Sequence, residues 1–313
     1  MSSCLVTDAG SAWNGASGYG LFISTGNTSS WNQLIIANNG MVTNVTTVSL
    51  ADGLASSNNS LMVNGGKLYA TCVAFSNSLV NTMQMDSTAE VVLTSFIMTN
   101  SNQRLYFNGG TLTIRGAVVS NTFPFVVGDG VNSATLVVPL SGTNIFMDGL
   151  VITNGATLAG SGQIAATSTV FGTLSPGVTT GTVGTLVNNG ALTFKPAATI
   201  KIKLAAYTTP GAGWDLMVVT NGALTLGGTL KPVLMGGFLP TNTQSYMIMT
   251  NAGPLGMSGE FLNGGNSALI AAYSNDLIKV MGAFRLVLSN QCVVLNTFLP
   301  NSSLQRGTLF KFY

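Results

Sequence analysis

Hydrophobic and polar residues alternate in short stretches along most of the chain. The alternation is clearest between Leu174 and Leu230, in residues 191–194, 200–204 and 223–226. There, every second residue is aliphatic or aromatic, and its neighbours are Thr, Lys or Ala. This period is typical of a β-strand with one buried face. We find no amphipathic helical pattern before residue 265, so the sequence predicts an all-β protein.

Turn signals separate these stretches. Asn-Gly pairs predict turns because both residues tolerate positive φ, and the Leu-Ser-Pro-Gly sequence at 174–177 predicts another turn because Pro presets φ. The turn residues that we single out are Asn39, Gly40, Asn64, Gly65, Asn108, Gly109, Asn154, Gly155, Pro176, Gly177, Asn189, Gly190, Asn221 and Gly222.

The spacing of the turn signals indicates a repeat. The first Asn-Gly pairs, at Asn14, Asn39 and Asn64, are 25 residues apart. Between Asn64 and Asn154, with Asp86 and Asp129 as substitute turn signals, the steps are 22, 22, 21 and 25 residues. A fixed step of this size is typical of a solenoid, and three short strands with their turns fill it. We therefore expect a right-handed parallel β-helix, in which Asn side chains form hydrogen-bonded ladders. An antiparallel sandwich or barrel is the alternative.

The pattern changes near residue 266. We expect a β-solenoid over residues 1–265 and a C-terminal β cap or assembly segment over 266–313, with dense apolar strands at 269–273, 277–281, 284–288 and 292–295. Its apolar end could add a strand to a neighbouring molecule through Leu309, Phe310, Phe312 and Tyr313. Residues 155–190 are rich in Gly, Thr and Ser and predict a narrower part of the solenoid; a linker is the alternative.

Composition adds that the surface carries few charges. Charged residues make up 6% of the 313 residues, and the formal net charge is +2. Little electrostatic repulsion therefore keeps copies apart, which favours a protein that packs against itself. Lys201 and Lys203 share a strand and predict a small basic ridge on the outside, near Lys195 and Lys231. The ridge is too sparse for nucleic-acid binding. No apolar run is long enough for a transmembrane helix.

Residue types that usually carry catalysis are scarce. The chain has no His, which excludes the Ser-His-Asp triad and the common metal sites, so we expect no enzyme, cofactor or metal. Cys4, Cys72 and Cys292 show no disulfide framework, and we expect buried free thiols. The carboxylates that could act in pairs are Asp86 with Glu90 and Asp129 with Asp148, but the last two read as turn residues.

Four aromatic residues bear on ligand binding. Trp13, Trp31, Tyr69 and Tyr106 would serve as stacking platforms for a glycan if they point outward, but we expect core or turn packing for them. The sequons at Asn27, Asn44, Asn58 and Asn301 are no more than an Asn- and Ser-rich chain gives by chance.

Part of the sequence resembles a known family. A Leu-Ser-Pro-Gly turn at 174–177, Gly-Thr-Leu at 184–186, Trp-Asp-Leu-Met-Val at 214–218 and Leu-Thr-Leu-Gly-Gly-Thr-Leu at 224–230 follow one another as in proteins with autotransporter-associated β-strand repeats. The resemblance covers roughly residues 150–265. It implies an exported, passenger-like β-solenoid on the bacterial cell surface, in which Asp215 has a structural role and no residue is catalytic.

These observations leave two classes of function. The first is a structural, self-associating subunit of an extracellular fibre or surface layer, with copies of itself as partners. The alternative is an adhesin or glycan-binding module. The first residues, Met1 to Cys4, lack the pattern of a secretory signal. Either the protein is cytosolic, or the sequence starts after a removed signal or inside a longer precursor; the resemblance favours the extracellular location.

Overall fold

The computed structural model describes residues 2–15, 18–26, 28–77, 79–86 and 88–304. Over this part the chain forms strands throughout and one short helix, α1 (Asn301–Leu304). It divides into two compact units, which are described separately: unit 1 contains residues 1–157 and 164–166, and unit 2 contains residues 158–163 and 167–313. The predicted all-β class is confirmed.

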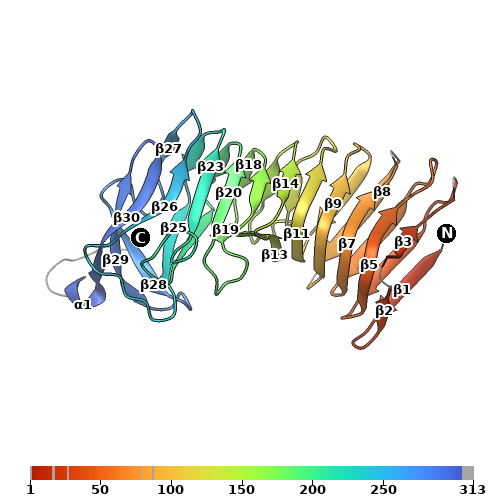
Figure 1. Ribbon diagram of the computed structural model, residues 1–313, viewed down its shortest axis with the longest axis horizontal. Coiled ribbons are helices and arrows are strands. Elements are labelled where there is room, and N and C mark those ends of the chain that lie inside the picture. The colour runs from red at the N-terminus through yellow and green to blue at the C-terminus, as the bar shows by residue number, and fades with distance from the viewer. Residues whose placement is uncertain (1, 16–17, 27, 78, 87, 305–313) are drawn as a thin grey trace. The chain divides into compact units, whose positions relative to one another are not determined.

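Unit 1 is a stack of coils whose strands pair in parallel with those of the next coil (Figure 1). Its first sheet contains β1 (Ser3–Thr7), β4 (Gln33–Ala37), β6 (Asn59–Asn64), β8 (Asn81–Asp86) and β10 (Gln103–Phe107). Its second sheet contains β2 (Ala12–Asn14), β3 (Gly20–Ile23), β5 (Met41–Leu50), β7 (Lys67–Phe75), β9 (Glu90–Met98), β11 (Gly110–Val119), β13 (Ala134–Val138) and β14 (Thr143–Phe146). The short strands β12 (Phe125–Val127) and β15 (Leu150–Ile152) pair on a third side.

The register stacks like residues in columns. Leu68, Val91, Leu112 and Leu136 occupy equivalent positions in successive coils and are all fully buried. Burying one such side chain contributes about 1.5–3 kcal/mol, so each inward column stabilises the stack. Equivalent residues lie 22 residues apart from Asn59 to Asn81, as predicted. The parallel β-solenoid is therefore confirmed, and the antiparallel alternative is excluded.

Unit 2 repeats this plan with longer coils. Its strands are β18 (Ser168–Val170), β19 (Thr173–Pro176), β20 (Thr185–Asn189), β21 (Leu192–Phe194), β22 (Thr199–Leu204), β23 (Leu216–Thr220), β24 (Leu224–Leu226), β25 (Thr229–Leu234), β26 (Ser245–Asn251), β27 (Met257–Gly259) and β28 (Leu269–Ser274). Stacked positions here lie 32 residues apart at Asn189 and Asn221, because the loops between strands are longer. The predicted step of 20 to 25 residues is therefore wrong for this unit.

The last coil of unit 2 is covered by antiparallel strands. β29 (Val280–Leu288) pairs with β28, β30 (Cys292–Pro300) pairs with β29, and the other edge of β30 pairs with β26. An aromatic cluster of Tyr246, Phe284 and Phe298 packs beneath them. The antiparallel strands thus pair with the edges of β26 and β28, as expected of a cap. The two strands predicted at 277–281 and 284–288 are wrong in detail, since they form the single strand β29.

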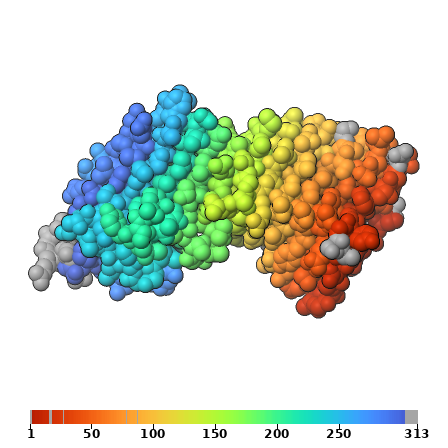
Figure 2. Space-filling view, viewed as in Figure 1, coloured from red at the N-terminus to blue at the C-terminus, as the bar shows by residue number. Residues whose placement is uncertain are grey.

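Two further corrections concern the middle of the chain. The predicted turn at 174–177 is wrong: Leu174, Ser175 and Pro176 belong to β19, and Gly177 forms an antiparallel bridge with Gly160. Residues 155–190 are no linker, because they carry short strands. These include β16 (Thr157–Gly160) and β17 (Gln163–Ala165), which lie where the chain passes between the two units. Side chains fill the space between neighbouring strands within each unit (Figure 2).

Candidate functional site

The predicted turn residues occupy the ends and corners of coils. Asn154 and Gly155 form a turn after β15, while Asn64 and Asn189 are the last residues of β6 and β20. Positive φ occurs at Asn39, Gly65, Gly155, Gly177, Gly190 and Asn221. Gly222 is required for close approach, because a Cβ there would overlap the backbone of Gly190 and Ala191 in the preceding coil. These residues shape the solenoid and form no common cluster.

A buried ladder of amide side chains runs through unit 1, as the sequence predicted. The side-chain carbonyl of Asn59 accepts hydrogen bonds from the backbone N–H and the amide group of Asn32, at 2.9 and 3.0 Å. The carbonyl of Asn81 accepts the same two bonds from Asn59, at 3.0 and 3.1 Å. Asn59 and Asn81 are fully buried. The ladder satisfies polar groups at a coil corner without any charge.

A buried ion pair joins neighbouring coils of unit 2. The Lys203 ammonium lies 2.9 Å from the Asp215 carboxylate, and both side chains are inaccessible to solvent. Lys203 also donates to the Ser175 hydroxyl at 3.1 Å and to the carbonyl oxygen of Pro176. Asp215 accepts backbone hydrogen bonds from Gly184 at 2.9 Å and from Lys203 at 2.8 Å. The predicted basic ridge is therefore wrong: Lys203 points inward, and only Lys201 is partly exposed.

Burial dominates the electrostatics of this pair. It raises the pKa of Asp215 to about 6, although the Lys203 ammonium and the backbone N–H groups favour the carboxylate. Burial likewise lowers the pKa of Lys203 against the attraction of Asp215. With all its proton donors and acceptors paired inside the protein, the cluster clamps β19, β22 and the residues that precede β20 and β23. We interpret it as structural, since no substrate reaches it.

The raised pKa predicts how stability depends on pH. The folded protein holds a proton on Asp215 that the unfolded chain releases between pH about 4 and 6, so the contribution of Asp215 to the free energy of unfolding falls as pH rises through that window. In Lys203→Met, the carboxylate loses its counter-ion and its pKa rises further. We expect this variant to be more strongly destabilised at pH 8 than at pH 5. Urea unfolding of both proteins at the two pH values measures this, and an equal loss would contradict it.

The carboxylates considered for catalysis serve local structure. Asp86 accepts a hydrogen bond from the Asn108 amide at 2.8 Å, whereas Glu90 accepts one from the Tyr69 hydroxyl at 2.8 Å. The oxygens of Asp129 accept hydrogen bonds from the backbone N–H groups of residues 131 and 132, which lower the pKa of this carboxyl. Asp148 accepts one from the backbone of Thr122. Asp129 and Asp148 are thus turn residues, as predicted. In the described part of the chain, no three His, Cys, Asp or Glu side chains are placed to hold a metal ion.

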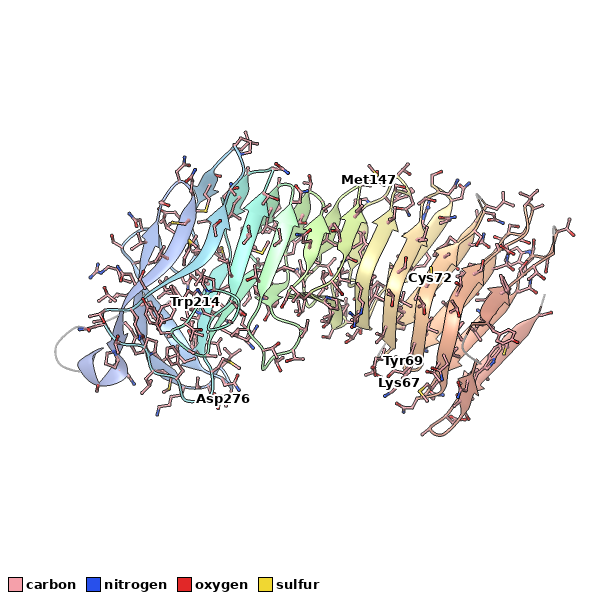
Figure 3. The ribbon with its side chains drawn as sticks, viewed as in Figure 1. Lys67, Tyr69, Cys72, Met147, Trp214 and Asp276 are labelled. Atoms are coloured by element: carbon pink, nitrogen blue, oxygen red, sulfur yellow. The ribbon has the colours of Figure 1, made fainter. Side chains whose placement is uncertain are left out.

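The four aromatic residues are more exposed than the sequence predicted. Trp13, Trp31 and Tyr106 are exposed, Trp31 to 60%, so the expectation of core packing is wrong for them. Tyr69 is half-buried beside Lys67 near one end of β7 (Figure 3), and burial together with Glu90 raises its pKa to about 12. They come from different strands and sheets. Sequence reasoning missed their exposure because a large aromatic residue in a β-strand is usually buried.

The three cysteines are free thiols, as expected, but they are not buried. Cys4 is exposed, and Cys72 and Cys292 are half-buried. Burial raises the pKa of the Cys72 thiol.

The first coil of unit 1 has an open edge. β1 pairs with β4, and β2 and β3 pair with β5, but their other edges pair with no strand among the described residues. The backbone N–H of Gln33 donates to the carbonyl of Ser2 at 2.9 Å, so Cys4 and Val6 face β4 and the N–H groups of Ser3, Leu5 and Thr7 point outward. Leu5 is 59% exposed on this strand. The first coil contains one charged residue, Asp8, and no Lys or Pro that would discourage pairing.

A hollow of about 410 Å³ opens at this edge. Apolar side chains of Leu21, Phe22 and Leu34 line it together with Trp13, Cys4 and the amide groups of Asn32 and Gln33. The hydrophobic interior of the stack is thus accessible at the first coil, whereas antiparallel strands cover the last coil of unit 2. The sequence gave no direct signal for this, because an uncovered edge depends on what packs against it. The predicted assembly residues Leu309, Phe310, Phe312 and Tyr313 lie outside the described residues.

Comparisons with known proteins add no assignment: neither protein-family models nor curated protein sequences match this chain. Within its described part, the chain has no helix with the length and apolarity needed to cross a membrane.

Proposed function

We propose that this protein is a structural, self-associating β-solenoid, a subunit of a fibre or layer on a bacterial surface. The observation that carries the proposal is the open, nearly uncharged edge of the first coil. Outward-pointing backbone N–H groups and an accessible apolar interior lose free energy in water and gain it by pairing with another chain. A second copy can supply a strand of the same kind, and Asp8 is the only charge that would oppose its approach.

Three further features support this role. The side chains that satisfy the coil corners are amides, such as Asn59 and Asn81, so the stack holds together without surface charge. A scaffold of this kind requires no catalytic group or cofactor. The resemblance of residues 150–265 to autotransporter-associated repeats supports an extracellular, cell-surface location.

The test compares two exposed leucines of unit 1. Leu5→Lys places a charge on the open edge, whereas the control Leu140→Lys places the same charge on an exposed loop position between β13 and β14. By sedimentation velocity and negative-stain electron microscopy, we expect the wild type and Leu140→Lys to associate with rising concentration. Leu5→Lys should associate about tenfold more weakly or not at all. A wild-type protein that stays monomeric throughout would overturn the proposal.

A second candidate function is glycan binding at the same hollow. Trp13 and Phe22 offer apolar ring faces there, and the Asn32 and Gln33 amides offer donors and acceptors for hydroxyl groups. Saturable binding of an oligosaccharide by the monomer, lost in Trp13→Ala, would favour this function over self-association.

A further inference from the structure

The outer face of the second sheet of unit 1 carries an apolar column along the stack. The register places Phe22, Ser49, Ala74, Ile97, Val118 and Ile145 at equivalent positions of successive coils. Phe22 is 49% exposed, Ile97 36% and Val118 42%. Branched and aromatic side chains that stand next to one another on an outward face form a continuous ridge. We call this column the ridge.

A column of small residues runs directly beside the ridge. Two residues earlier on the same strands, and therefore on the same face, the register aligns Gly20, Thr47, Cys72, Ser95 and Gly116. Cys72 lies on β7 within this column (Figure 3). A Cβ at Gly116 would meet no atom closer than 3.7 Å, so its surroundings are open. We call this column the groove.

The face that holds ridge and groove carries no charge. Residues 20–23, 46–50, 71–75, 94–98, 116–119 and 143–146 contain no Asp, Glu, Lys or Arg. Arg115 lies just outside the face, and its guanidinium donates a hydrogen bond to the Ser141 hydroxyl at 3.0 Å. A second copy therefore meets no like charge on approach and buries no unpaired ion.

We infer that two copies pack laterally through this face, with the ridge of each copy seated in the groove of the other. A two-fold axis parallel to the stack, between the two columns, brings every ridge residue opposite a groove residue of the same coil: Ile97 opposite Ser95 of the second copy, and Val118 opposite Gly116. Because both copies have the same spacing between coils, the match continues along the stack. Such a contact is self-complementary, as a two-fold interface requires.

The size of the face sets the strength of the contact. Six strands at about 4.8 Å and a width of about five residues at about 3.3 Å give roughly 450–500 Å² per copy. The total for two copies is about 900–1,000 Å², at the lower limit for a specific interface. We therefore expect a weak dimer that forms at high protein concentration. Combined with the open edge, it would give each copy two different contacts, which allows an extended assembly where one two-fold contact stops at a dimer.

This inference deepens the proposed function and rests on it for its biological role, but the two contacts can be tested separately. Cys4 lines the hollow at the open edge, Cys72 lies in the groove, and Cys292 on β30 of unit 2 serves as reference. Alkylation with iodoacetamide over a range of protein concentrations, read for each cysteine by peptide mass spectrometry, reports which surface is covered. Cys72 should react several-fold more slowly at high concentration, relative to Cys292.

Two variants complete the test. Ile97→Lys places a charge on the ridge and should restore the reactivity of Cys72 at high concentration. The control Val126→Lys, at an exposed position on β12, should leave the protection of Cys72 intact. Protection of Cys4 alone would support the edge contact and overturn the lateral one, and protection of Cys72 alone would do the reverse. Equal reactivity of Cys72 at all concentrations overturns this inference.

Discussion

Asp215→Asn is expected to lower the free energy of unfolding by about 3–5 kcal/mol, the usual cost of breaking a buried ion pair by removing one partner. Every contact of the Asp215 carboxylate is a donor: the Lys203 ammonium and the backbone N–H groups of Gly184 and Lys203. An amide nitrogen in place of one oxygen would face such a donor, and the Lys203 charge would lose its counter-ion. Chemical denaturation at pH 7 measures the loss.

Lys201 provides the matched control for this prediction. It lies two residues before Lys203 on β22 and is partly exposed, so Lys201→Met should change stability by about 0.5 kcal/mol or less. The double variant Lys203→Met/Asp215→Asn should recover part of the loss, because no uncompensated charge remains. If Asp215→Asn unfolds within about 1 kcal/mol of the wild type, the buried pair does not hold these coils together.

Asn59→Ala is expected to cost about 2–4 kcal/mol, the second largest effect. The change removes the acceptor of two hydrogen bonds from Asn32 and both donors' continuation of the ladder at the side chain, so that the buried carbonyl of Asn81 keeps only the backbone N–H of residue 59. A buried polar group that loses its partner costs about 1–3 kcal/mol. The urea midpoint measures the effect.

An exposed ladder supplies the comparison. The Asn44 amide donates to the carbonyl oxygen of Asn14 at 2.7 Å on the surface of unit 1. Water replaces the lost partner there, so Asn14→Ala should cost about 0.5 kcal/mol or less. Equal losses in the two variants would show that burial of the amide ladder contributes nothing.

The sequence predicted the fold well because its signals are local. Alternation at residues 191–194, 200–204 and 223–226 reports one buried face, and β21, β22 and β24 lie there. Asn-Gly spacing reports coil length where turns are short, which is why the step holds in unit 1. It fails in unit 2, because residues 205–215 form a longer loop between β22 and β23 that no turn signal measures.

The candidate surfaces could not be predicted in the same way. Lys203 continues the alternation of Lys201, yet it faces inward, because the distant Asp215 in the returning loop compensates its charge. Exposure of Trp13 and Leu5 depends on the absence of a paired strand beyond the first coil, which no pattern within these residues encodes. The ridge and groove become visible only once the register aligns Ile97 with Val118 and Ser95 with Gly116.

Sedimentation equilibrium of the wild-type protein tests the central claim most directly. The claim is that an uncharged parallel solenoid associates with copies of itself. The account predicts an average mass that equals the 32.2 kDa monomer at the lowest concentration and rises steadily over about a hundredfold increase in concentration, with little dependence on salt because the contacts carry almost no charge. A mass that stays at the monomer value over the whole range would contradict it.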